Sequence, residues 1–359
     1  MNNAVRLLVN SREYGGWKQV EITAGLDRMA RDFTLEVTDR WPGQTSLRPI
    51  QPGDTCTVFI GEDRVITGYI DGTPLRYDAR SVSLSVQGRS RTADLVDCAP
   101  LHATGQIKQK TVEQIARLLA EPYGVSVAAE VDTGSVVPTH HMNPGETVAE
   151  SLDRLLQLRQ LLATDDAEGR LILTRAGMTR ADTALVVGQN ILSASAELDM
   201  RERFSEYRVK GQRSGSDTDH GAAVSAQMGV STDGAVTRKR VHVETARGQA
   251  DIAACRRQAE WVAAHRAAQT YKVIYTVQGW RQASGALWEP NRVVRVTDPV
   301  IGWDQDMVIG EVVYGLSDSG MTSTLTVAPR AAWSLEPQED KKPSRSAAGP
   351  YHIPVEIKL

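Results

Sequence analysis

The chain has 359 residues, is 41% hydrophobic and carries a formal net charge of -3 at pH 7. This balance excludes a whole-chain basic field for nucleic acid, and the length predicts two or three domains with a sizeable core. No run of about 18 apolar residues exists and the N-terminus lacks the apolar centre of a signal peptide, so we expect folding in a cytoplasm without stable membrane insertion. Three widely spaced cysteines favour free thiols.

Residues 1–92 are predicted to form a first β domain. Residues 57–60 and 65–70 are apolar runs on either side of a Gly-Glu-Asp-Arg turn, and residues 82–86 alternate apolar with polar side chains. Further strands are expected at residues 5–9, 19–23 and 33–37, before the chain breaks at Trp41-Pro42-Gly43.

The same β design recurs near the other end of the chain. Residues 65–68 (VITG) align with residues 307–310 (MVIG), and residues 83–86 (SLSV) align with residues 324–327 (TLTV). We interpret this as a β unit that is used twice. Two unrelated β meanders can also match by chance, and the sequence leaves that alternative open.

Residues 93–178 are predicted to form an α+β insert domain. Thr111 and Thr147 each stand three residues before a Gln or Glu, which is a capping-box pattern, and apolar residues follow at helical spacing. A turn of consecutive acids, residues 165–168, then leads into an apolar strand at residues 171–174. We interpret these acids as a solvated hairpin tip rather than a pair of catalytic carboxylates.

Residues 179–334 are predicted to form a second β-barrel-like domain with one long helix. Residues 251–268 are rich in alanine and continuous, so they predict that helix. The strand near Leu185 could belong to either barrel, and the Gly-rich stretch 211–234 predicts a long loop. The fold class is therefore mixed and mainly β, with two similar β-barrel-like domains and a small helix–strand domain.

Residues 335–359 are predicted to be a linker followed by a strand that binds a partner. The linker contains Pro337, Pro343 and Pro350 among charged and small residues, and the last nine residues alternate strictly. A strand with one apolar face and no neighbour of its own is suited to completing a partner's sheet, although folding back onto its own domain remains an alternative. The apolar side chains that would bind the partner are Tyr351, Ile353, Val355, Ile357 and Leu359.

The sequence offers no catalytic, cofactor-binding or metal-binding constellation. His140 and His141 are adjacent and would point to opposite faces of a strand, and the Asp217-Thr218-Asp219 loop lacks the ligands of a complete calcium site. Phosphate-binding and nucleophile motifs are missing. Tryptophans in the second half could be sugar platforms, but core packing is their commoner use. We therefore expect a structural protein rather than an enzyme, with no cofactor.

Several stretches resemble the tail hub, or late control D, family of contractile-tailed phages. They are residues 88–100 (GRSRTADLVDCAP), 145–175 and 287–333. The resemblance implies a homotrimeric ring in the tail baseplate of the virion, with two similar β domains per chain giving pseudo-sixfold symmetry. It also implies a fold shared with the T-even phage hub and with type VI secretion spike proteins. The implied partners are the tail tube, other baseplate proteins and the central tail spike protein, and phage DNA would pass through transiently.

A second functional class stays open at this point. Residues 145–148 (GETV) stand before a helix and are loosely similar to the opening of a peptidoglycan-binding repeat. The alternative is therefore a tail protein that binds or degrades the cell wall.

Overall fold

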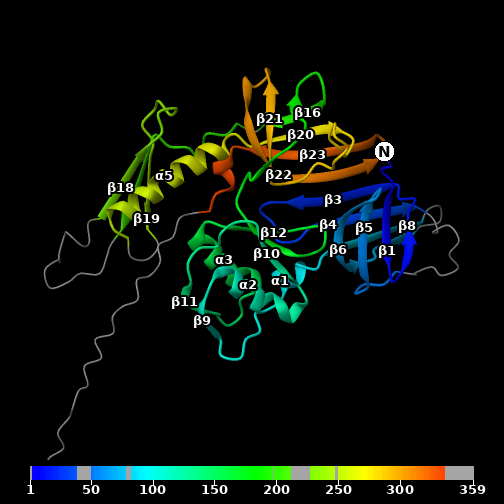
Figure 1. The fold of residues 1–359 in the computed structure, drawn as a ribbon. Coiled ribbons are helices and arrows are strands. Elements are labelled where there is room, and N and C mark those ends of the chain that lie inside the picture. Colours follow the sequence, from blue (N-terminus) through cyan, green and yellow to red (C-terminus); the bar gives the residue numbers. More distant parts are fainter. Residues whose placement is uncertain are drawn as a thin grey trace, which may run out of the picture.

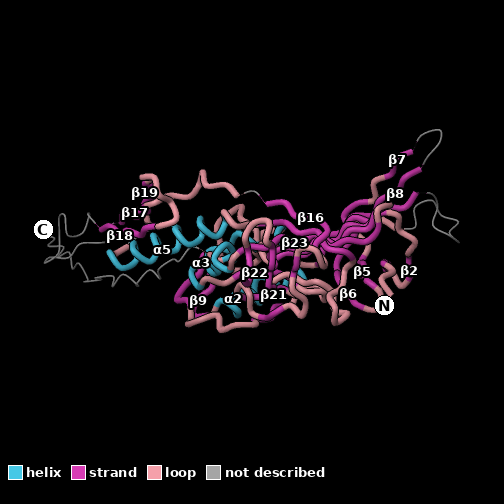
Figure 2. The backbone as a smooth tube through the Cα atoms, turned by 90° about the horizontal axis from the view of Figure 1, so that it is seen from above, coloured by secondary structure: helices cyan, strands magenta, loops and turns pink. Residues whose placement is uncertain are grey.

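The computed structural model describes residues 2–38, 50–77, 82–196, 198–211, 227–246 and 250–335. Figure 1 shows a large sheet, an α+β unit beside it, and a third unit of one helix on a small sheet. Seen from above, the third unit and the N-terminal strands lie at opposite ends of an elongated molecule (Figure 2). The predicted class, mixed and mainly β with a helix–strand insert, is confirmed.

The first β unit is built from strands whose buried side alternates with an exposed side. In β5, Cys56, Val58 and Ile60 are buried while the residues between them are partly or fully exposed. This period of two places all three side chains in one core. The strands of this unit are β1 (Val5–Val9), β2 (Arg12–Tyr14), β3 (Gln19–Gly25), β4 (Asp32–Thr38), β5 (Thr55–Ile60), β6 (Asp63–Gly72), β7 (Leu75–Tyr77) and β8 (Val82–Ser90).

The second β unit follows the insert and contributes to the same core. Its longest strand, β22, has 15 residues and a bulge at Gly310, where its pairing with β23 shifts register. The strands are β14 (Thr179–Arg180), β15 (Leu185–Val186), β16 (Ile191–Ala196), β20 (Val273–Gln278), β21 (Arg292–Asp298), β22 (Trp303–Ser317) and β23 (Gly320–Ala328), followed by the short helix η2 (Arg330–Trp333). The strand near Leu185 joins this unit, since β15 pairs in parallel with β21.

The two β units share one continuous sheet of fifteen described strands. The main path runs β16-β20-β23-β22-β3-β4-β8-β6-β5-β1-β2. The β22–β3 pairing is the junction between the second unit and the first. None of the sheets in the described part of the chain closes into a barrel: the end strands of the main path, β16 and β2, do not pair with each other.

The insert forms its own core between helices and two small sheets. Both predicted capping boxes are present, with Thr111 paired to Gln114 and Thr147 paired to Glu150. The core is the cluster that includes Leu119 and Leu152. The elements are α1 (Ala93–Asp97), β9 (Gln106–Lys110), α2 (Val112–Ala120), η1 (Glu121–Tyr123), β10 (Val127–Ala129), β11 (Val137–His141), α3 (Val148–Arg159), β12 (Leu162–Asp165) and β13 (Leu171–Thr174).

The predicted long helix lies on a separate three-stranded sheet. This helix, α5 (Ile252–Gln269), starts at Asp251, whose side chain accepts a hydrogen bond from the Ala254 amide. It packs on β17 (Glu206–Gly211) and β18 (Gln227–Thr232), and β19 (Val241–Thr245) completes the sheet beside β17. A Cβ on Gly229 would lie 2.2 Å from the backbone of the helix, so glycine permits this close contact.

The repeat extends to five strands per unit rather than three. The order β3-β4-β8-β6-β5 in the first unit has the same chain connectivity as β16-β20-β23-β22-β21 in the second, and every neighbour pair is antiparallel. The predicted duplication is therefore present. Its residue-by-residue alignment was wrong in register: counted along the paired strands, Gly68 matches Met307 rather than Gly310, and Val86 matches Leu325 rather than Val327. The bulges on β6 and β22 fall at matching positions, residues 71 and 310, so the bulge itself is part of the repeat.

Candidate assembly interfaces

The junction between the two β units is a buried antiparallel pairing of β3 with the second half of β22. Val20 lies opposite Leu316 and Ile22 lies opposite Tyr314. Val20, Ile22 and Tyr314 are each 3% exposed or less. The Tyr314 hydroxyl donates to the Trp288 carbonyl, so this polar group is satisfied inside the core. The junction is thus a packed interior rather than a loose contact between domains.

Arg281 joins the two units at a second point. It comes from the loop after β20 and reaches the turn between β5 and β6, with its guanidinium 2.6 Å from the Asp63 carboxylate. It also donates to the Ile60 carbonyl at 3.1 Å and to Asn3 at 2.8 Å. The side chain is 13% exposed. An arginine that is this buried and this fully bonded fixes the relative position of the two units.

The insert is held to the first β unit by a buried ion pair. The Asp165 side chain is fully buried, accepts a hydrogen bond from the Arg31 amide at 3.0 Å, and lies 3.4 Å from the Arg31 guanidinium. Burial raises the pKa of Asp165, and the neighbouring Arg31 acts in the opposite direction. The interpretation of residues 165–168 as a solvated tip was therefore wrong for Asp165. Asp165 is the last residue of β12 and faces Arg31 of the first unit, whereas Glu168 lies in the turn that follows and stays exposed.

A cavity of about 560 Å³ lies where the insert meets both β units. Arg31, Asp165 and Tyr314 line it together with residues of the loop before β21. Its wall carries arginines and carboxylates of both signs, and several of these already form ion pairs with each other. These ion pairs connect residues where the insert and the β units meet, so we interpret the cavity as a polar contact region between them.

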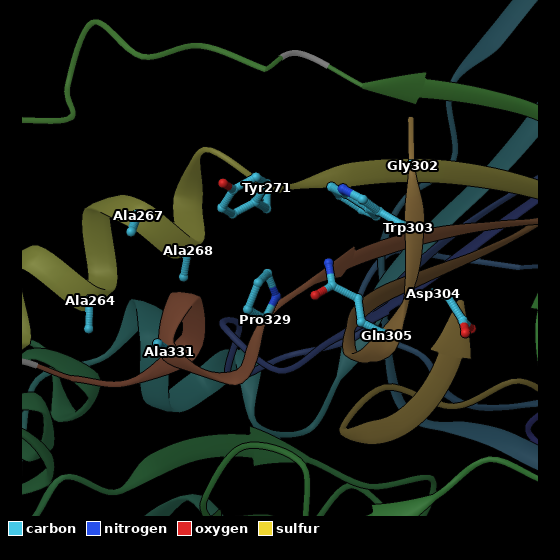
Figure 3. A pocket seen from close by; sticks show the side chains of 10 residues that line it. All are labelled: Ala264, Ala267, Ala268, Tyr271, Gly302, Trp303, Asp304, Gln305, Pro329 and Ala331. Carbon is cyan, nitrogen blue, oxygen red and sulfur yellow. The ribbon is translucent and has the colours of Figure 1, made fainter. Parts of the chain in front are cut away.

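A second hollow of about 580 Å³ lies between α5 and the β21–β22 hairpin (Figure 3). One wall consists of the small side chains of Ala264, Ala267 and Ala268, with Tyr271 just beyond the end of the helix, and Trp303 lies across from them. Asp304 is the one acidic residue among those that line it. A wall of alanines and aromatic rings offers shape and apolar surface but no acid–base pair.

The histidines and tryptophans that the sequence offered as metal-binding or sugar-binding candidates have structural roles in the described part of the chain. His140 is buried and bonded to Ser151 at 2.9 Å, whereas its neighbour His141 is exposed, as expected for adjacent residues on a strand. Within the described ranges no group of three metal-ligating side chains comes together, and no helix there is long and apolar enough to cross a membrane. The tryptophans at 280, 288, 303 and 333 are buried, which supports core use. The Asp217-Thr218-Asp219 loop lies outside the described residues.

The predicted partner-binding residues also lie outside the described part of the chain. They are Tyr351, Ile353, Val355, Ile357 and Leu359. Conversely, sequence reasoning missed Arg281 and the β3–β22 junction. The available signal was the stretch 307–316 (MVIGEVVYGL), in which Glu311 is the one charged residue, because it is longer than a typical strand.

Comparison with known proteins identifies relatives along nearly the whole chain. Residues 4–90 match the family model "Mu phage baseplate assembly protein GpP-like, N-terminal", residues 92–175 match "Baseplate hub protein gp44-like, second domain", and residues 251–336 match "Mu phage baseplate assembly protein GpP, fourth domain". Baseplate hub protein gp44 of Escherichia phage Mu is 34% identical, with 95% of this chain and 92% of that protein covered.

Solved structures agree with these matches. The 43 kDa tail protein of prophage MuSo2 from Shewanella oneidensis has a TM-score of 0.84 at 31% identity, covering 92% of this chain and 99% of that one. The tail protein from Neisseria meningitidis MC58 has the same fold, with a TM-score of 0.78 at 24% identity and 93% and 98% coverage. The E. coli type VI secretion component c3393 shares the fold more distantly, with a TM-score of 0.55 at 12% identity and 94% and 80% coverage. The chain belongs to the phage baseplate hub family and is a structural component of the tail baseplate of the virion.

Proposed function

We propose that three copies of the chain close into a ring that joins the tail tube to the central spike and lets DNA pass. The duplicated five-strand unit supports this proposal more than any other observation. Each chain carries two such units, so three chains present six similar positions around a ring, which suits a sixfold tube. The weak net charge of -3 suits a channel that DNA crosses without being held.

The oligomeric state tests the ring directly. Native mass spectrometry and sedimentation over a range of concentrations should give three times the chain mass of 39.2 kDa. A protein that stays monomeric at the highest concentration would contradict the proposed function.

We further propose that the C-terminal strand attaches the spike. Its apolar residues Tyr351, Ile353, Val355, Ile357 and Leu359 would add a strand to a sheet of the spike protein, with main-chain hydrogen bonds supplying affinity. Deleting residues 351–359 should leave the ring intact and abolish co-purification with the spike. A truncated chain that still retains the spike would show that the attachment lies elsewhere. The division into units at residues 1–92, 93–178 and 179–334 remains part of the same proposal.

The alternative, a protein that binds or degrades the cell wall, gains no support from residues 145–148. Thr147 caps α3 and Val148 is buried in the core of the insert, so folding accounts for both residues. We therefore expect no enzymatic activity and no cofactor. A zymogram that shows lysis of purified sacculi would contradict this expectation.

A further inference from the structure

The internal repeat predicts where a second junction of the same kind should form. In the first junction, β3 pairs with the second half of β22. In the repeat, β3 of the first unit is equivalent to β16 of the second unit. Likewise, β6 and β7 together are equivalent to β22. Residues 194–196 of β16 pair with β20 on one side, and among the described strands no partner lies on their other side. The described part of the chain thus contains one complete junction and two unpaired halves of another.

Burial separates the two sets of matched residues. Tyr314 in the complete junction is 3% exposed, but Leu75, its match on β7, is 40% exposed. Ile22 is buried, whereas its match on β16, Ala196, is exposed. Leu75 is thus an apolar side chain in a core-type position, and no described strand lies beside it on the open side.

The backbone of the β6–β7 edge is able to pair. Pro74 lacks an amide hydrogen, but its carbonyl accepts from the Ser85 amide at 3.0 Å, on the side of β8. Since the amide and carbonyl of one strand residue point to the same side, the missing donor faces β8. The open edge therefore keeps the donors of Thr73 and Leu75.

The turns next to the two junctions differ in the same way. Arg281 from the second unit covers the β5–β6 turn of the first unit. The matching turn, between β21 and β22, carries Val300 at 81% exposure. The Val300 and Ile301 amides donate hydrogen bonds to the buried Asp298, which holds this turn in place. Its exposed apolar side chain is therefore suited to contacting a partner.

We infer that residues 194–196 of one copy pair in antiparallel fashion with residues 75–77 of a second copy of this chain, in the register of the β3–β22 junction. That register places Ala196 opposite Leu75, as Ile22 lies opposite Tyr314. The contact is heterologous, so it closes a ring when the rotation between copies fits a whole turn. The inference rests on the proposed trimer and names the strand edges that would build it.

Cysteine cross-linking tests the register. Leu75→Cys and Ala196→Cys are combined in a chain with Cys98→Ser, since Cys56 and Cys255 are buried. Opposed residues on paired strands lie about 4.5–5.5 Å apart at Cα, within the range that a disulfide spans. The control combines Leu75→Cys with Ser195→Cys, whose side chain points to the other face of the strand. Circular dichroism checks that each variant folds.

Non-reducing electrophoresis of the Leu75→Cys, Ala196→Cys protein should show covalent dimers and trimers, and the Ser195→Cys control should show at least tenfold less of them. A trimer by sedimentation without the 75–196 link would overturn the proposed register and leave the ring standing. A ladder that extends beyond three chains would support the seam and contradict the closed ring. A monomer at every concentration, without cross-links, would overturn both.

Discussion

Replacement of Asp165 by alanine tests how the insert is held to the first β unit. The change removes a fully buried carboxylate and leaves the Arg31 guanidinium, which is 15% exposed, without its counter-ion. Breaking a buried pair from one side costs about 3–5 kcal/mol. Burial raises the pKa of Asp165, which means that the ionised carboxylate is itself costly, so we expect a loss near the lower end, about 3 kcal/mol.

Asp165→Asn should cost less, about 1–2 kcal/mol, because the amide oxygen still accepts from the Arg31 backbone. Glu168→Ala in the same turn is the matched control: its side chain is 52% exposed and it should change the free energy of unfolding by under about 0.5 kcal/mol. Urea unfolding is followed by far-ultraviolet circular dichroism, which reports the helices, and by tryptophan fluorescence.

The two probes can separate the units because every tryptophan lies outside residues 93–178. In Asp165→Ala we expect the part of the circular dichroism change that comes from α1, α2 and α3 to occur at lower urea than the fluorescence transition, as the insert loses its anchor. A loss below about 1 kcal/mol, or one equal to that of Glu168→Ala, would refute the view that this pair holds the insert.

Two further substitutions test packing and protonation. A Cβ on Gly310 would lie 2.1 Å from the Trp333 ring, so Gly310→Ala should lower the free energy of unfolding by about 2 kcal/mol or more. A Cβ on Gly315 would lie 3.4 Å from its nearest neighbour, so Gly315→Ala should lower it by about 1 kcal/mol or less. Urea denaturation measures both changes. Burial lowers the pKa of His140 to about 4. The neutral ring therefore makes its full contribution to the free energy of unfolding above pH 6.5, and about 3 kcal/mol of that free energy is lost as the pH falls towards 4. His140→Gln should flatten that loss in pH-dependent unfolding, while the exposed His141→Gln should leave it unchanged.

The local elements could be predicted because short-range chemistry decides them. The helix starts at Thr111 and Thr147 follow from a hydroxyl and a carboxamide or carboxylate three residues apart, and the structure contains both capping boxes. The long helix follows from a continuous alanine-rich run behind Asp251. Strand faces such as Cys56, Val58 and Ile60 follow from alternation.

Which strands lie side by side depended on contacts that no local pattern contains. The β3–β22 junction joins residues nearly 300 positions apart, and the register of the repeat is visible only once the strands are paired. Asp165 illustrates the same point: its neighbours in sequence suggest a wet turn, but Arg31 from another unit encloses it.

The sequence alone therefore determined the kinds of elements, the duplication of a β unit and the family, because these follow from residue order and periodicity. The tertiary structure decided that the two β units share one sheet, that Arg281 and Arg31 fix the units together, and which strand edges remain open. The physical reason is that burial and strand pairing are properties of residues brought together from distant parts of the chain.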